Sequence, residues 1–187
     1  YEVQVEAFDG HSREYLRAGR SFYLFSSKMP KGLSQLQKDL LRYYMDIRYV
    51  ADEKSKDIYH ELEDWPSRMV FLRSFWQSID PSPSTDVNER LVEHVLRMGQ
   101  ADRRFYPGKD RQGSDTDRGR VFVQLGPPDD VDYHTYAAGQ KPYEVWIYEQ
   151  QGRHEFVFRD RTGDGVYDLV HSTYPGEVFN PYWSQEF

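Results

Sequence analysis

In the first half of the chain, apolar side chains recur every three or four positions, which is the spacing of one face of an α-helix. Ser34 precedes the first such stripe and is a favourable N-cap residue; the stripe comprises Leu33, Leu36, Leu40, Tyr44 and Ile47. A second helix is predicted over residues 51–62. Its apolar positions are few (Ile58, Tyr59 and Leu62), so it is expected to lie at the surface.

Two further helices follow in the pattern. One begins at Asp64-Trp-Pro, because proline is tolerated in a first helical turn, and it ends at Asp80-Pro-Ser-Pro-Ser. Its buried stripe is Met69, Leu72, Phe75 or Trp76, and Ile79. The next helix starts from a cap at Thr85 or Asp86, with Asp86 and Glu89 at capping-box spacing, and reaches about Phe105. Its inner face is predicted to carry Val87, Leu91, Val95, Met98 and Phe105.

The second half changes to the two-residue alternation of half-buried strands. Strands are predicted over residues 121–125, Tyr143–Tyr148, 155–159 and 166–171, with turn-rich connectors at residues 150–153 and 160–165. A polar loop, residues 113–120, feeds the first strand, and Pro127-Pro128 stops it. Helices followed by strands indicate an α+β fold, in which N-terminal helices pack on a C-terminal antiparallel β-meander of about four strands.

The two ends of the chain differ from this middle. Residues 1–32 are predicted to be an extended arm: residues 1–7 alternate as an edge strand or a docking arm, and residues 20–26 are apolar enough for a strand or a buried extended segment. Residues 33–173 are predicted to form a single domain. The aromatic tail, residues 174–187, contains two prolines and is expected to drape over a surface as irregular chain.

Composition narrows the classes of function. A net charge of −7 argues against a surface that tracks nucleic-acid phosphates, and no apolar run approaches the ~20 residues that span a bilayer. The absence of Cys excludes disulfides and thiol catalysis. The chain begins at Tyr1 without Met, so removal of an upstream segment is expected. Aromatic residues make up 16% of the chain, which suits a modest core or a partner-binding surface.

Three ordered segments carry a family resemblance. Residues 75–85 (FWQSIDPSPST), residues 113–129 (GSDTDRGRVFVQLGPPD), and the later strands at residues 143–148 and 156–163 resemble bacterial proteins with a GWxTD domain. The resemblance covers roughly residues 64–171. One departure is that Ser114 stands where the motif has its tryptophan. The resemblance implies an exported, extracytoplasmic protein, periplasmic or membrane-peripheral, and brings with it neither an established activity nor defined functional residues.

One turn has the oxygen pattern of a calcium loop. The candidate ligands alternate along it, and they are Asp160, Thr162, Asp164 and Asp168. The loop lacks the downstream bidentate glutamate of an EF-hand. The alternative, which the sequence favours, is a hairpin in which Asp160 and Asp164 accept backbone N–H bonds while Gly163 and Gly165 take positive φ. The prediction is therefore that the chain binds no metal and no cofactor.

Acidic residues also gather around the polar loop, at Asp115, Asp117, Asp129, Asp130 and Asp132. Paired carboxylates catalyse acid–base chemistry when burial separates their pKa values, but loop aspartates usually make Asx-turns. We therefore interpret Asp115, Asp117, Arg118 and Arg120 as a structural loop whose arginines form ion pairs.

The histidines and the common catalytic motifs give no stronger signal. His94, His134, His154 and His171 do not occur at metal-ligand spacing. The sequence contains no nucleophile elbow, P-loop or dinucleotide fingerprint. The prediction is that the protein is not an enzyme.

The tail rings are the candidate partner-binding residues: Tyr174, Phe179, Tyr182, Trp183 and Phe187. Docking onto a partner and wrapping over their own domain remain open. The leading hypothesis is a non-enzymatic extracytoplasmic interaction or scaffold module, an accessory subunit of a membrane-associated assembly with protein partners, no nucleic acid and no transmembrane segment in this chain. The alternative is a carbohydrate-binding or glycan-processing domain that uses exposed aromatic rings and loop aspartates, with carboxylates ~5–10 Å apart if it hydrolyses glycans.

Overall fold

The computed structural model describes residues 6–7, 16–17, 31–108, 111–134, 141–150 and 152–185. The chain forms two compact units, Tyr1–Leu96 and Arg97–Phe187, and their boundary falls within helix α4 (Glu89–Arg104). We call them the helical unit and the sheet unit. The single domain expected over residues 33–173 stays a prediction. In the N-terminal region, β1 (Glu6–Ala7) pairs antiparallel with β2 (Leu16–Arg17), whereas residues 20–26 lie outside the described part.

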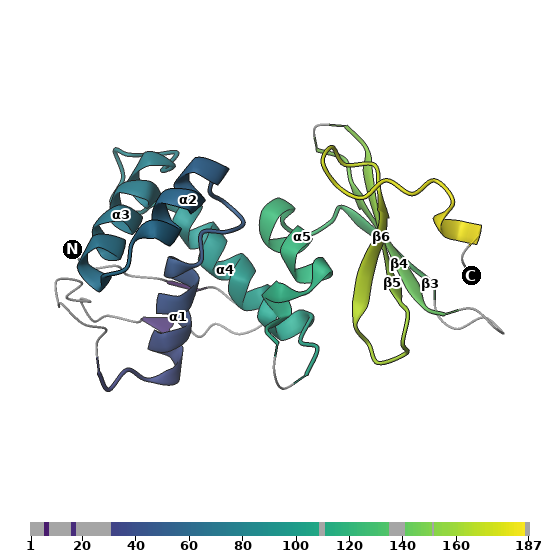
Figure 1. Ribbon diagram of the computed structural model, residues 1–187, viewed down its shortest axis with the longest axis horizontal. Coiled ribbons are helices and arrows are strands. Elements are labelled where there is room, and N and C mark those ends of the chain that lie inside the picture. The colour runs from purple at the N-terminus through teal and green to yellow at the C-terminus, as the bar shows by residue number, and fades with distance from the viewer. Residues whose placement is uncertain are drawn as a thin grey trace. The chain divides into compact units, whose positions relative to one another are not determined.

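The helical unit contains α1 (Gln35–Met45), α2 (Glu53–Glu61), α3 (Trp65–Ser78) and the first half of α4 (Figure 1). Ser34 is the N-cap of α1, as the sequence predicts, and it forms a complete capping box with Gln37. Asp52 and Asp64 cap α2 and α3 in the same way, each by accepting a backbone N–H three residues ahead.

The predicted cap of α4 is wrong. Neither Thr85 nor Asp86 is the cap; the side chain of Asn88 accepts the N–H of Leu91 at 2.8 Å. The Thr85 hydroxyl is used earlier, in a turn in which it contacts the carbonyls of Ser82 and Val87. The irregular segment after α3 is therefore longer than its two prolines indicate, and Val87 is exposed ahead of the helix.

The core of the helical unit is formed by α3 and by the residues that directly follow α1. Its buried residues are Ile47, Met69, Leu72, Phe75 and Trp76, so both of the alternative ring positions in α3 are buried. The rings of Phe75 and Trp76 meet edge to face at 5.2 Å. In α1 the buried positions are Leu41 and Tyr43, whereas Leu36 of the predicted stripe is exposed.

The sheet unit holds a four-stranded antiparallel meander in the order β3-β4-β5-β6 (Figure 1). Its strands are β3 (Asp130–His134), β4 (Tyr143–Tyr148), β5 (His154–Asp160) and β6 (Tyr167–Ser172). Helices followed by this sheet confirm the α+β fold. The bounds of β4 are those predicted from alternation, and β5 and β6 differ from the prediction by one residue at each end.

The predicted strand at residues 121–125 is wrong, because this segment belongs to helix α5 (Asp117–Leu125). Thr116 caps the helix, and Gly126 ends it with φ 87°. Three consecutive residues (Val121, Phe122 and Val123) are all buried, so the alternation in the sequence does not mark an exposed and a buried face. The fourth strand of the meander is β3 instead.

Different elements pack on the two faces of the sheet. On one face, Phe105, which directly follows α4, packs on Phe122 of α5 and on Trp146, and Trp146 packs on Phe158 at 4.8 Å. On the other face, Trp183 of the tail lies 5.5 Å from the Tyr143 ring. Residues Gly113 to Arg120 therefore begin the helix that packs on one face of the sheet, and the end of the tail, at Trp183, lies on the opposite face.

Candidate functional site

The polar segment of residues 113–120 is closely packed against its surroundings. It forms a short 3-10 helix, η1 (Gly113–Asp115), and then the first turn of α5. A Cβ on Gly113 would overlap the backbone of Ala101, and a Cβ on Gly119 would overlap the carbonyl of Gly113. Both glycines are therefore required by close approach of backbone to backbone.

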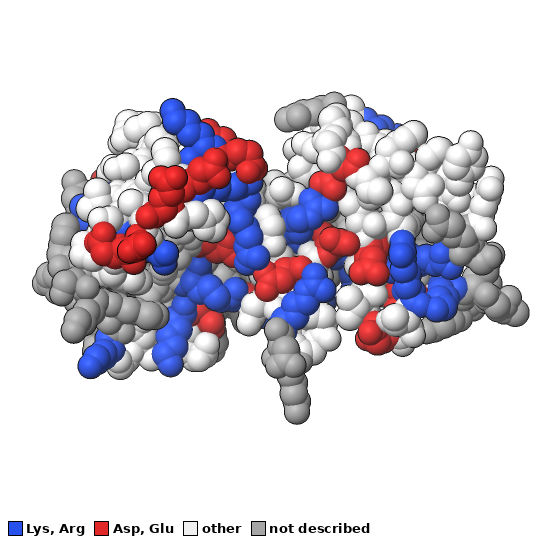
Figure 2. Space-filling model, in the orientation of Figure 1, with Lys and Arg blue, Asp and Glu red and all other residues white. Residues whose placement is uncertain are grey.

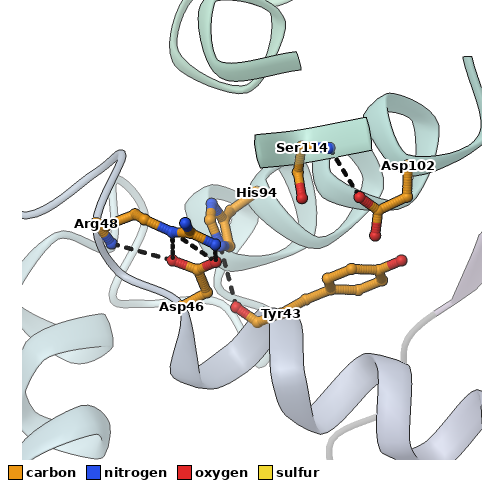
Figure 3. A network of polar contacts seen from close by, with 6 residues as sticks. All are labelled: Tyr43, Asp46, Arg48, His94, Asp102 and Ser114. Atoms are coloured by element: carbon orange, nitrogen blue, oxygen red, sulfur yellow. Dashed lines mark hydrogen bonds and ion pairs between the residues drawn. The ribbon is translucent and has the colours of Figure 1, made fainter. Parts of the chain in front are cut away.

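Hydrogen bonds fix this segment in place. The buried Thr116 hydroxyl donates to the Gly113 carbonyl at 2.7 Å and accepts the N–H of Gly119 at 3.0 Å. The Ser114 N–H donates to the Asp102 carboxylate at 2.8 Å, as Figure 3 shows. Ser114 is completely buried, and its backbone rather than an aromatic ring provides this anchor.

Arg118 joins the segment to the sheet. Its guanidinium donates to the Glu144 carboxylate at 2.9 Å, and both side chains are nearly buried. The Trp146 indole N–H donates to the other oxygen of Glu144, also at 2.9 Å. Arg118 lies 3.9 Å above the centre of the Tyr167 ring and donates to the Gly165 carbonyl. One arginine thus connects α5 with β4, with β6 and with the turn that precedes β6.

Asp117 and Arg120 make two further connections from α5. The Asp117 carboxylate accepts the N–H of Leu169 in β6 at 2.7 Å. Arg120 forms a bidentate ion pair with Glu177 of the tail, at 2.6 and 2.8 Å. The arginines therefore form ion pairs as the sequence predicts, but with glutamates far along the chain. Asp115, the remaining member of the segment, lies in η1, and its carbonyl accepts from Arg111.

The other aspartates near this segment make local structural bonds. Asp129 accepts the N–H of Glu149 at 2.7 Å, and Asp130 accepts that of Val131 at 2.9 Å. Asp132 contacts the His134 ring nitrogen at 2.9 Å. Burial of the Tyr143 hydroxyl, with a smaller contribution from the Asp132 charge, raises the pKa of Tyr143.

The turn between β5 and β6 has the hairpin geometry that the sequence favours. The Asp160 carboxylate accepts the N–H groups of Gly163 at 2.6 Å and Gly165 at 2.9 Å, and more weakly that of Thr162. Both glycines have positive φ, 80° and 84°. The hydrogen bond from the N–H of Val166 is the main cause that lowers the pKa of Asp164. Asp168 lies exposed in β6, opposite Arg159.

Within the described ranges, no three His, Asp or Glu side chains converge in the arrangement that a metal ion requires. Calcium binding by Asp160, Thr162, Asp164 and Asp168 is not decided by this, and the expected lack of binding stays a prediction.

The tail follows the outer edge of β6. The Ser172 N–H donates to the Val178 carbonyl at 2.7 Å, and the Asn180 N–H donates to Nδ1 of buried His171 at 3.1 Å. The Tyr174 ring packs on Phe156, and the Trp183 ring lies near His171 and Tyr143. These two rings of the predicted set therefore contact their own sheet.

The other rings of the predicted set differ. Phe179 is 68% exposed and Tyr182 is 65% exposed, although the Phe179 ring has one neighbour, His171, at 5.3 Å. Phe187 lies outside the described residues. The structure thus divides the predicted partner-binding set into rings that attach the tail and rings that face solvent.

The model of the GWxTD domain matches residues 17–185, which is nearly the whole chain. The chain belongs to the GWxTD domain family. No curated protein and no solved structure matched it. In this GWxTD domain the name-giving residues are Gly113, Ser114, Thr116 and Asp117, and they form the joint between α4 and α5 described above.

The GWxTD chain also has a buried histidine whose role the sequence does not reveal. His94 of α4 is 1% exposed, and its Nε2 lies 3.0 Å from the Tyr43 carbonyl (Figure 3). Because a carbonyl only accepts, Nε2 carries the proton of the neutral ring. Burial lowers the pKa of His94 to about 4, with the Tyr43 and Asp46 contacts opposing that shift and the Arg90 charge reinforcing it.

Burial also changes the pKa values of two tyrosines in this GWxTD domain. Burial raises the pKa of Tyr44 to about 12. Burial also raises the pKa of Tyr148, whose hydroxyl donates to the Gly126 carbonyl at 2.9 Å. Both phenols therefore stay neutral and act as structural groups.

On the surface of the helical unit, Figure 2 shows basic and acidic side chains lying beside each other. The ion pairs of this unit include Arg48–Asp46, Lys56–Glu53 and Arg90–Glu93. Among the described residues, none of the helices combines the length and the apolar composition needed to cross a bilayer.

Proposed function

We propose that this GWxTD domain is a non-enzymatic, extracytoplasmic protein-interaction module whose contact surface is the C-terminal tail. The observation that carries the proposal is the state of three apolar side chains at residues 178–182. Val178, Phe179 and Tyr182 are 46%, 68% and 65% exposed. Their backbone is nevertheless held by bonds to β6 at Val178 and Asn180, and the side chain of Glu177, directly before them, pairs with Arg120 of α5.

A fixed backbone with exposed rings is suited to binding. Large aromatic side chains supply most of the energy of many protein interfaces, because they bury much area and have few rotamers to lose. Their exposure in water has no benefit for the isolated domain. Ordering the backbone in advance lowers the entropy cost of association. The tail thus has the properties of a preformed contact surface.

The chemistry of the tail also indicates the kind of partner. Residues 178–185 contain no charged side chain, although the whole chain carries a net charge of −7. The complementary surface is therefore an uncharged, apolar groove on a protein. A strongly basic surface would instead need a run of acidic residues opposite to it.

The non-enzymatic part of the proposal draws support from the motif residues. Asp117, Arg118 and Arg120 each bind a group on another element of the sheet unit. A catalytic carboxylate or guanidinium needs a side of its polar group turned to substrate, and these groups are used in packing.

The location of the protein is inferred from the family resemblance, which implies export. We propose a periplasmic or membrane-peripheral position, where the domain serves as an accessory subunit of a membrane-associated assembly. Fractionation of cells that contain the native protein tests this part, and recovery in the cytoplasm would contradict it.

The contact surface is tested by double substitution of the two exposed rings, Phe179→Ala with Tyr182→Ala. The variant should keep its fold and lose at least about tenfold in affinity for its protein partner, because each ring is expected to supply more than ~1 kcal/mol. The measurement is quantitative co-purification from native membranes, with identification by mass spectrometry. Tyr133→Ala is the matched control, because Tyr133 of β3 is 63% exposed and lies outside the tail. An equal loss of affinity in the tail variant and the control, or no loss in either, would contradict the tail as the partner-binding surface.

A further inference from the structure

The tail is attached to α5, the helix that the GWxTD motif begins. We propose that Arg120 is a positioning residue that holds the tail in its docked place, so that the motif helix sets the geometry of the interaction surface. The docking itself is a property of the sheet unit alone. Its consequence for partner binding rests on the proposed function above.

The contact between Arg120 and Glu177 has the geometry of a strong ion pair. The two guanidinium nitrogens lie 2.6 and 2.8 Å from the two carboxylate oxygens, which is a bidentate arrangement. The side chains are 26% and 17% exposed, so water screens the pair less than it screens a fully exposed one. The Gln124 side chain, one turn further along α5, accepts a second bond from Arg120 and orients the guanidinium.

Glu177 lies where the tail changes direction. The Glu177 N–H donates back to the Tyr174 carbonyl at 3.2 Å, and Gly176 has φ 87°, so residues 174–177 form a tight turn. The next residue, Val178, accepts from Ser172 and is the first exposed residue of the contact surface. The ion pair therefore fixes the chain immediately before the residues that would meet a partner.

The second attachment lies within the contact surface, at Asn180 between Phe179 and Tyr182. The Asn180 N–H donates to Nδ1 of His171, and the Tyr182 N–H donates to the Asn180 side chain. Phe179 thus lies between the Arg120 attachment and the His171 attachment. Loss of the first should release Val178 and Phe179 from β6 while the β-sheet remains intact.

Two backbone amides report directly on docking. The Ser172 amide is bonded to the tail at Val178, and the Asn180 amide is bonded to the sheet at His171. Amide hydrogen exchange followed by NMR therefore measures undocking without knowledge of any partner. Amides in the middle of β5 report on the opening of the whole sheet and separate undocking from general destabilisation.

The experiment compares Arg120→Glu, Glu177→Arg and the charge-swapped double variant. In each single variant, the Ser172 and Asn180 amide hydrogens should exchange at least about tenfold faster, while the exchange of β5 amides is unchanged. The charge-swapped double variant should restore slow exchange. Lys56→Glu is the control, because Lys56 pairs with Glu53 on α2 of the helical unit and has no bond to the tail among the described contacts. Unchanged exchange in both single variants, or a swap that fails to restore it, would overturn the inference.

The same variants then separate the two proposals. If the single variants undock the tail and weaken partner co-purification, and the swap restores both, the motif helix positions a true contact surface. If undocking occurs and co-purification is unchanged, Arg120 still positions the tail, but the tail as the contact surface is refuted.

Discussion

The two units of this protein join their elements with different chemistry. In the helical unit, neutral side-chain donors bind carbonyls near the ends of α1 and α3, whereas Arg68 binds the Leu62 carbonyl at the end of α2. Trp76 donates to the Tyr44 carbonyl at 3.0 Å, His94 donates to the Tyr43 carbonyl, and Asn88 donates to the Trp76 carbonyl. In the sheet unit, charged side chains of α5 bind to the sheet and the tail: Asp117, Arg118 and Arg120.

This difference determines which perturbation each unit resists. A helix leaves its last carbonyls without intrahelical partners, and a neutral donor from a neighbouring helix satisfies them without a charge in the core. Such bonds are little affected by salt, but protonation of His94 would place a charge in the core. In a nearly buried ion pair, removal of one partner leaves the other charge without compensation. The predictions below test this contrast, from the largest expected effect to the smallest.

Gly119→Ala should have the largest effect, because the new Cβ would meet the Gly113 carbonyl and neither backbone segment can move independently. We expect a loss of about 5 kcal/mol in the free energy of unfolding of the sheet unit, as for other severe backbone clashes. Denaturant titration with residue-resolved hydrogen exchange would measure it. Gly165→Ala is the control: its Cβ has open space, so only the strain of positive φ remains, about 1 kcal/mol. Similar losses of unfolding free energy in the two variants would contradict a role for the close approach of backbone to backbone at Gly119.

Arg118→Met should destabilise the sheet unit by about 4 kcal/mol, because Glu144 would remain as a nearly buried carboxylate without its cation. The double variant Arg118→Met with Glu144→Leu should recover part of that loss. Chemical denaturation of both variants, with Arg153→Met as an exposed control, gives the comparison. A double variant that is less stable than the single one would show that the charge of Glu144 is not the cause.

Acid should affect the helical unit through His94. Its pKa is lowered to about 4 in the folded state, whereas an ordinary histidine titrates near 6.5. Between pH 6.5 and pH 4, His94 binds a proton in the unfolded chain but not in the folded chain. The free energy of unfolding therefore has its maximum above pH 6.5 and falls as the pH drops toward 4. The maximum loss is about 3 kcal/mol. Denaturation of the helical unit across this range, followed by hydrogen exchange in α3, would measure it.

His94→Gln keeps a donor for the Tyr43 carbonyl and cannot titrate, so it should flatten this pH dependence. His60→Gln, at an exposed position of α2, should leave the dependence in place. If His94→Gln kept the pH dependence of stability and His60→Gln removed it, His94 would not be the cause of the acid response.

Calcium should have the smallest effect. Asp160 already accepts three backbone N–H groups in the β5–β6 turn, so its oxygens are used in folding that turn. We expect the melting temperature to be the same with and without millimolar calcium. A large rise at sub-millimolar calcium would make the turn a metal site and would add a second kind of charge pairing to the sheet unit.

The sequence predicts those parts of the fold that follow from local patterns. β4 alternates between half-buried and buried residues along its whole length, so its bounds could be predicted. Helices α1 to α3 begin at cap residues that are visible in the sequence. Residues 121–125 could not be assigned, because a short helix that is buried on several sides has no polar face to mark its period. The buried Val121, Phe122 and Val123 therefore resemble a strand.

The candidate site was predictable only in part. The aspartates and glycines of residues 160–165 bond within their own turn, and local chemistry is sufficient to predict that. That Arg118 and Arg120 would form ion pairs was also predictable, but their partners lie 26 and 57 residues away and depend on the tertiary fold. The same holds for the tail, where the sequence alone does not distinguish the attached ring of Trp183 from the exposed ring of Phe179.

The donors that complete α1 have a consequence for the order of folding. Trp76 and His94 lie 32 and 51 residues after the carbonyls that they bind. An isolated helix of 11 residues is marginal in water, so the last turn of α1 gains its full stability only after α3 and α4 have assembled beside it. Substitution of these donors should accelerate unfolding much more than it slows folding. Helix α1 is therefore synthesised before α3 and α4 but reaches its full stability only after they have folded.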